Sequence, residues 1–145
     1  AMNQHDEIHK KLTLELIREQ YPDIADRIFS AKEWILSRPW ADNILFIMLY
    51  GSVARGQATN HSDIDPAIGM KKNPADHMAI RKEIVLKRPY DELDIRLFDQ
   101  LPMYIQKDVL NGIILYCDDM VFMIWHMILS NDIEGFRDIW MTILG

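Results

Sequence analysis

The sequence predicts a single α/β domain of the α+β kind, in which a small mixed β-sheet of about four strands is flanked by helices. The chain has 145 residues, which is enough for one domain with a sizeable core. Hydrophobic residues make up 49% of it and charged residues 26%, a composition typical of globular proteins. Short segments of strand length alternate along the chain with segments whose apolar residues recur at helical spacing.

Two helices are predicted before the first strand. Apolar residues at four-residue spacing predict a helix over about 6–20, which Tyr21-Pro22 ends. A second amphipathic helix is predicted from Ile24 to Ile35, with Asp23 as its N-terminal cap. Arg38-Pro39 ends this helix, because the residue before a proline disfavours helical geometry.

Four segments are predicted to form the sheet. Ile44 to Tyr50 is a continuous apolar run, which is typical of a strand covered on both faces. The segments 63–70 and 92–98 are the second and third predicted strands, and the third alternates between apolar and polar residues. Gly112 to Tyr116 is predicted to be the last short strand.

Helices and loops are predicted between these strands. Residues 52–56 are expected to form a short helical turn, and residues 57–62 a polar loop. A third helix is predicted to open at Pro74 and to run to about Lys87, and a fourth covers about 101–110. These connections place helices on the sheet, as the predicted fold class requires.

The C-terminal part leaves two interpretations open. Met120 to Leu129 is apolar nearly all round, and a final helix over 131–144 carries an apolar stripe. Either both helices pack on the domain, or part of their Met- and Trp-rich surface docks a protein partner. The predicted organisation is one domain over 1–145, with two N-terminal helices, a core of about 44–116 and C-terminal helices over about 119–144.

Charge and cysteine content exclude several classes of protein. The net charge of -6 argues against a large nucleic-acid surface, because phosphate backbones need clustered Lys and Arg. The single cysteine, Cys117, excludes an internal disulfide, and no secretory signal precedes the first helix, so a cytoplasmic location is expected. No apolar run is long enough to cross a bilayer, so no membrane contact is expected.

The most informative segment joins the first two strands. Gly51-Ser52 follows the apolar run, and Asp63-Ile64-Asp65 comes after ten intervening residues. Because side chains alternate along a strand, Asp63 and Asp65 point the same way. Two adjacent carboxylates repel unless a cation lies between them, and Mg²⁺ prefers such oxygen ligands. The Gly51-Ser52 turn, if it opens a helix, offers free backbone N–H groups to phosphates.

A third carboxylate completes this pattern. Asp94 lies in the middle of its predicted strand, on the face opposite the apolar neighbours. If that strand lies beside the Asp63 strand, three carboxylates converge and can hold two divalent ions for in-line displacement at phosphorus. Asp94 would then accept the proton of the attacking hydroxyl. Arg96 shares the face of Asp94 and either contacts a nucleotide or, as the favoured interpretation, pairs with a nearby carboxylate.

These motifs resemble a known family. Gly-Ser-Val-Ala-Arg-Gly at 51–56, Ser-Asp-Ile-Asp at 62–65 and the later Leu93-Asp94-Ile95 are similar to the DNA polymerase β-type nucleotidyltransferase superfamily, and most of all to its minimal nucleotidyltransferases, the MNT family. The resemblance covers roughly Ile44 to Tyr116. It implies the nucleotidyltransferase fold and transfer of AMP from ATP to a hydroxyl, with release of pyrophosphate. It also implies an antitoxin that adenylylates a tyrosine on a helical HEPN-domain ribonuclease toxin.

The resemblance also implies roles for individual residues. By position, it assigns nucleotide binding to Gly51, Ser52 and Arg55, with the arginine either contacting phosphate or anchoring the loop. It assigns catalysis and the binding of two Mg²⁺ ions to three aspartates, namely Asp63, Asp65 and Asp94. ATP is then the expected substrate and Mg²⁺ the expected cofactor.

One departure and two alternatives accompany this interpretation. Pro66 stands where the family usually carries an aliphatic residue such as Leu. Proline removes a hydrogen-bond donor from a strand, so the Asp65 carboxylate is expected in a slightly altered frame. The first alternative is a nucleotidyltransferase for a small-molecule acceptor, similar to the aminoglycoside enzymes. The second is a non-catalytic antitoxin that neutralises its partner by binding alone.

Overall fold

The computed structural model describes residues 14–59, 61–71 and 77–121. Helices and strands interleave along this part of the chain, in the order α2 (Leu14–Gln20), α3 (Pro22–Leu36), η1 (Ala41–Asn43), β1 (Ile44–Tyr50), α4 (Gly51–Ala54), β2 (Asp65–Met70), α5 (His77–Lys87), β3 (Arg96–Leu97), η3 (Phe98–Gln100), α6 (Met103–Leu110) and β4 (Ile113–Cys117). Within these ranges, no helix is both long enough and apolar enough to cross a membrane.

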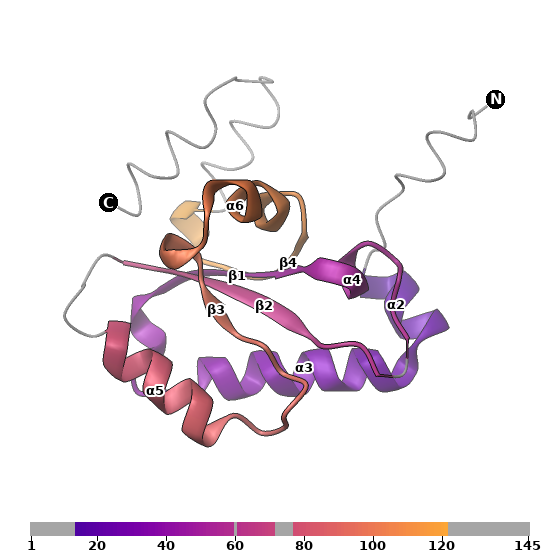
Figure 1. Cartoon of the computed structure of the whole chain (residues 1–145), viewed down its shortest axis with the longest axis horizontal. Helices are drawn as coiled ribbons and strands as arrows, with labels where there is room; N and C mark the ends of the chain where they lie inside the picture. Colours follow the sequence, from indigo (N-terminus) through magenta and orange to yellow (C-terminus); the bar gives the residue numbers. More distant parts are fainter. Residues whose placement is uncertain (1–13, 60, 72–76, 122–145) are drawn as a thin grey trace.

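The strands form one mixed sheet in the order β3-β2-β1-β4 (Figure 1). β1 pairs antiparallel with both β2 and β4, whereas β2 pairs parallel with β3. The predicted fold class, a mixed sheet of about four strands flanked by helices, is therefore confirmed. The first predicted strand also has the predicted bounds, since Ile44 to Tyr50 forms β1.

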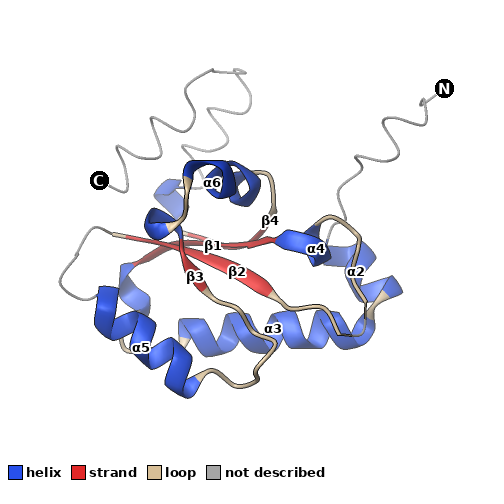
Figure 2. Ribbon diagram, viewed as in Figure 1, coloured by secondary structure: helices blue, strands red, loops and turns tan. Residues whose placement is uncertain are grey.

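Helices cover both faces of the sheet (Figure 2). Side chains of α2, α3 and α5 pack with the larger core cluster on one face, where Ile47 and Leu49 of β1 are fully buried. The smaller cluster on the other face includes Phe46 and Met48 of β1 and Val109 of α6. From Phe46 to Leu49, successive residues of β1 thus pack into opposite layers, which explains why this strand is apolar without interruption.

The described helices agree with the predicted ones in part. α3 begins at Pro22 and its N-cap residue is Tyr21, so the predicted capping role of Asp23 is wrong. Proline is favoured in the first turn because its missing N–H has no partner there in any case. Of the helices predicted over 6–20 and 74–87, residues 14–20 and 77–87 are described and helical. The predicted C-terminal helices lie outside the described residues from 122 onward.

The third predicted strand is shorter than expected. In place of a strand over 92–98, the structure has an isolated parallel bridge between Ile64 and Leu93 and then the two residues of β3. Phe98 belongs to η3 and its ring meets that of Phe46 edge to face, with centroids 5.3 Å apart. The predicted strand over 92–98 is wrong in its length.

Pro66 gives a physical reason for the interruption. The Ile64 N–H donates to the Glu92 carbonyl at 2.8 Å, and the Asp94 N–H donates to the Ile64 carbonyl at 2.9 Å. Backbone groups of alternate residues face the same neighbour, so residue 66 is the next one to face this segment. Because proline has no N–H, the ladder is broken between Leu93 and β3.

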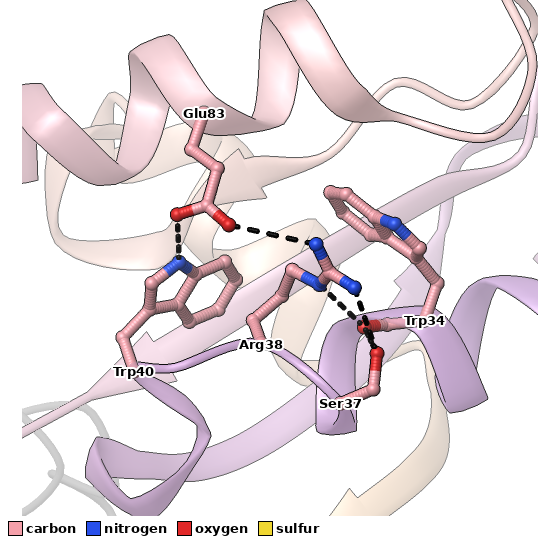
Figure 3. A network of polar contacts seen from close by, with 5 residues as sticks. All are labelled: Trp34, Ser37, Arg38, Trp40 and Glu83. Atoms are coloured by element: carbon pink, nitrogen blue, oxygen red, sulfur yellow. Dashed lines mark hydrogen bonds and ion pairs between the residues drawn. The ribbon is translucent and has the colours of Figure 1, made fainter.

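A polar network ties α5 to the end of α3 (Figure 3). The indole N–H of Trp40 donates to Glu83 at 3.0 Å, and the Arg38 guanidinium lies 3.6 Å from the other oxygen of Glu83. The same guanidinium lies 4.6 Å from the centroid of the Trp34 ring and donates through Nε to the Trp34 carbonyl. One half-buried carboxylate thus connects two helices of the same layer.

Replacing Glu83 should show how much this connection contributes. Glu83→Ala leaves the Trp40 N–H without an acceptor, so we expect the free energy of unfolding to fall by about 1–2 kcal/mol in urea denaturation. Glu83→Gln keeps an oxygen for that bond and loses only a partly exposed ion pair, so its loss should be about 0.5 kcal/mol or less. Equal losses for the two variants would contradict this account.

Candidate functional site

The turn after β1 requires glycine for two reasons. Gly51 has φ of 78°, in the left-handed region that other residues rarely adopt. A Cβ atom placed on Gly51 would also collide with the carboxylate of Asp65. The turn opens α4, and the first N–H groups of a helix have no partner within it. Gly51 and Ser52 therefore bring free backbone donors beside a carboxylate.

Asp63 and Asp65 flank a fully buried isoleucine. Ile64 is 0% exposed and belongs to the larger core cluster, so the aspartates on either side of it turn away from that core. Asp65 is half-buried and lies opposite Tyr50 in the antiparallel register of β1 and β2. Asp63, two residues before Asp65, is exposed. The charge of Asp63 acts on the Asp65 carboxylate, so the two lie close together; that they point the same way stays a prediction.

Asp94 is held by its neighbour Arg96. The Arg96 Nε donates to one Asp94 oxygen at 2.9 Å, and Nη2 donates to the other at 3.4 Å. The favoured interpretation of Arg96, pairing with a nearby carboxylate, is therefore confirmed. The backbone bond from Asp94 to the Ile64 carbonyl fixes this pair beside the Asp63 and Asp65 segment. Asp94 raises the pKa of Arg96 through this bond and its charge.

Asp63 and Asp94 lie near enough to Asp65 for their charges to act on it. Burial raises the pKa of Asp65 to about 6, and the negative charges of Asp94 and Asp63 add to this rise. Arg96 and Arg55 act in the opposite direction on Asp65, but they do not offset the rise. Negative charge is therefore in excess at this point of the surface, which is the condition that a bound cation relieves.

The oxygen donors of this site suit a divalent cation, but the described side chains do not form a complete set of metal ligands. Carboxylate oxygens are the donors that Mg²⁺ prefers, and within the described part of the chain neither Asp63 nor Asp65 forms an ion pair that would compete for them. Within the ranges that the structure describes, however, no group of three or more His, Cys, Asp or Glu side chains is arranged to hold a metal. The oxygens of Asp94 face Arg96 instead. The metal-binding role of all three aspartates stays a prediction.

Arg55 lies at the end of α4 and pairs with α6. Its Nη1 lies 3.2 Å from the Asp108 carboxylate, and both side chains are partly exposed. This contact agrees with the loop-anchoring role among the two that were predicted for Arg55. Ser52 is half-exposed, and its carbonyl accepts the N–H of Gln57 at 2.9 Å, which closes the turn.

The sequence interpretation missed Tyr50. The pKa of Tyr50 is raised to about 12. Burial is the largest cause, and the negative charges of Asp65 and Asp94 add to it. The phenol therefore stays protonated beside the carboxylates, with its ring on the face of the smaller core cluster. Its place as the last residue of an apolar run, directly before Gly51, is the signal that was available.

The site consists of carboxylates and free backbone donors at one end of a small mixed sheet, an arrangement suited to phosphate transfer. Residues 39–120 match the family model described as polymerase beta, nucleotidyltransferase. The match covers more than half of the chain, and the chain therefore belongs to this nucleotidyltransferase family. Membership implies a nucleoside triphosphate as substrate and, as a rule, a divalent cation.

The chain is also similar to a Methanocaldococcus jannaschii protein that bears the name "putative protein adenylyltransferase". The two are 31% identical over 96 residues, which cover 65% of this chain and 67% of that relative. No solved structure matches the chain significantly.

Neutralising Asp65 should stabilise the metal-free protein at neutral pH. The pKa of Asp65 is raised from 3.8 to about 6 in the folded protein. The contribution of protonated Asp65 to the free energy of unfolding is therefore complete below pH of about 4, and it is lost as the pH rises through about 6. At pH of about 7.5 in EDTA, the free energy of unfolding of Asp65→Asn should therefore exceed that of the original protein by about 1–2 kcal/mol, after allowance for solvent screening.

Thermal unfolding followed by circular dichroism measures this difference. At pH of about 3 the variant and the original protein should unfold alike, because Asp65 is then largely protonated in both the folded and the unfolded state. Asp26→Asn, at an exposed position of α3, is the matched control and should change little at either pH. A variant that is less stable than the original protein at neutral pH would contradict the charge excess.

Proposed function

We propose that this nucleotidyltransferase uses Mg²⁺ and ATP to transfer AMP to a hydroxyl of a protein. The observation that carries the proposal is the half-buried Asp65 carboxylate, which packs against the Gly51 turn and lies within reach of the charges of Asp94 and Asp63. This arrangement pairs an excess of negative charge with donors for phosphate oxygens, the two requirements for holding a metal-bound triphosphate.

The chain's own residues have separate tasks in the proposed reaction. The N–H groups of Gly51 and Ser52 bind triphosphate oxygens, and Asp63 and Asp65 hold the cation. When bound, Mg²⁺ neutralises phosphate charge and lowers the pKa of the attacking hydroxyl. Asp94 takes the proton of that hydroxyl, and Arg96, at 2.9 Å, positions the Asp94 carboxylate.

The chemical step balances without a further reactant. The acceptor oxygen forms a bond to the α-phosphorus of ATP, and the bond from that phosphorus to the bridging oxygen of the β-phosphate breaks. Pyrophosphate leaves with the electron pair of the broken bond, and the hydroxyl proton passes to the carboxylate of Asp94. The products are an adenylylated hydroxyl and pyrophosphate.

A protein acceptor is favoured by the named relative and by the resemblance to minimal nucleotidyltransferases. The relative bears the name of a protein adenylyltransferase. The resemblance points to a tyrosine of a HEPN-domain ribonuclease toxin, with this chain as the cytoplasmic antitoxin. The aspartates lie at the surface of the described residues, where a second protein reaches them. Arg55 then anchors the phosphate-binding turn through Asp108.

Intact-mass spectrometry tests the transfer. A HEPN-domain partner incubated with this protein, ATP and Mg²⁺ should gain the mass of one or more AMP groups. Asp63→Asn combined with Asp65→Asn should reduce the rate by at least about a thousandfold, because an interaction of several kcal/mol in the transition state is lost. Asp91→Asn, an exposed carboxylate near the same segment, is the control and should transfer normally.

Toxin rescue in cells separates catalysis from occlusion. The Arg96 pair on Asp94 and the interrupted β3 favour a second candidate, in which this protein neutralises its partner by binding alone. Full rescue by the double aspartate variant would establish that candidate in place of transfer. Loss of rescue, with the variant still bound to its partner, is the result that transfer requires.

Metal and nucleotide binding have their own readout. Mg²⁺ with a non-hydrolysable ATP analogue should raise the thermal midpoint of the original protein, since a ligand that binds only the folded state stabilises it. At a concentration of about 100 times the dissociation constant, the gain is about 2.7 kcal/mol. The double aspartate variant should show no Mg²⁺-dependent part of this shift. An equal shift in both proteins would place the metal elsewhere.

A further inference from the structure

Helix α5 carries apolar side chains on two opposite faces. His77, Ile80 and Ile84 are buried against the sheet layer. On the outward face, Met78 is 82% exposed, Val85 66% and Leu86 70%. Spacing of seven and eight residues puts Val85 and Leu86 on one stripe with Met78. Such an exposed stripe exceeds what a helix needs for its own packing.

Basic residues lie within and beside this stripe. Arg81 and Lys82 line the same shallow hollow as Met78, Val85 and Leu86, and no acidic residue lines it. This local positive charge contrasts with the net charge of -6 on the whole chain. We call these residues, together with the adjoining cleft that Arg81, Arg88 and Arg96 line, the α5 surface.

The cleft between α5 and β3 continues this surface to the candidate site. It has a volume of about 270 Å³, and its lining includes three arginines, Arg81, Arg88 and Arg96. Arg81 and Val85 line both the hollow and the cleft, so the two are contiguous. The one carboxylate in the lining is that of Asp94, the residue proposed to take the acceptor proton.

The three arginines differ in how far they are already engaged. Arg96 holds Asp94, and Arg88 donates through Nη1 to the Leu93 carbonyl at 3.1 Å. Arg81 is exposed, and among the described residues it has no hydrogen bond or ion pair. An anionic group that enters the cleft therefore meets an uncommitted guanidinium within the same cavity as Asp94.

We infer that the α5 surface docks the acceptor protein, through a helix with an apolar face and acidic side chains beside it. The inference rests on the proposed function, because it deepens the nature of the acceptor. An apolar helix stripe is complementary to the apolar face of another helix, and the arginine cleft is complementary to carboxylates. A partner seated on both lies beside Asp94, which lines the cleft. A small-molecule acceptor would leave the apolar stripe unused.

Two variants on α5 and two controls on α6 test the docking. Leu86→Glu places a charge in the apolar stripe, and Arg81→Glu reverses the charge of the cleft. Tyr104→Glu and Lys107→Glu make the same kinds of change on α6, which covers the other face of the sheet (Figure 1). All four side chains are exposed, so all four variants should keep the thermal midpoint of the original protein.

Isothermal titration with the HEPN-domain partner measures the effect. Leu86→Glu and Arg81→Glu should each weaken binding by about tenfold or more, as expected where central contacts are lost. The α6 controls should stay within about twofold of the original protein, because they lie on the face of the sheet that α5 does not cover (Figure 1). Unchanged binding by both α5 variants, or an equal loss in the controls, overturns the inference. Absence of any binding by the original protein overturns it too.

Transfer assays separate this inference from the proposed function. At saturating partner, Leu86→Glu should recover the AMP-transfer rate of the original protein, because only docking is weakened. If the partner docks on α5 and gains no AMP, the proposed function fails and the docking stands. If AMP is transferred and the α5 variants bind normally, the docking alone fails.

Other occupants of the surface give distinct results. A concentration-dependent dimer that Leu86→Glu dissociates, with partner binding unchanged, would assign the stripe to a second copy of this chain. A lower thermal midpoint in Leu86→Glu alone would mean that the chain covers its own stripe. Binding of a single-stranded RNA oligonucleotide that Arg81→Glu abolishes and Leu86→Glu leaves intact would assign the cleft to nucleic acid. Each result overturns the inference.

Discussion

Partial burial of one carboxylate beside two others at the start of β2 is the constraint on which the rest of the site depends. Asp65 is half-buried and within reach of the charges of Asp63 and Asp94, and its pKa is raised to about 6. The fold tolerates this cost because the strand beneath is anchored by the fully buried Ile64. Gly51 lets the turn approach the same carboxylate without a side chain in between. Core packing and turn geometry together thus concentrate negative charge where a cation and phosphate are to meet.

Local patterns in the sequence predicted much of this arrangement. Strand β1 followed from one continuous apolar run, and the burial of Ile64 between two more exposed aspartates followed from the alternation of polar and apolar residues. Both depend on neighbours in the sequence, which is why they were accessible. The pairing of Arg96 with Asp94 was also accessible, because two residues apart on an extended segment lie on one side.

Other features depend on contacts between distant segments and were missed. The length of β3 is limited by Pro66, which lies on another strand, so the alternating pattern over 92–98 carried no sign of it. Tyr50 joins the site through its register opposite Asp65, and a register is set by the assembled sheet. The start of α3 at Pro22 follows from proline geometry, which outweighed the capping tendency of Asp23.

The short β3 has a consequence for the sheet as a whole. β3 is an outer strand, and an outer strand presents unpaired backbone groups that can recruit strands from other molecules. Only two residues of β3 pair regularly with β2, and a short edge strand is one of the ways in which proteins limit such recruitment. Pro66, which interrupts the ladder, therefore shortens this edge of the sheet, while the edge stays open to the side-chain contacts of another protein.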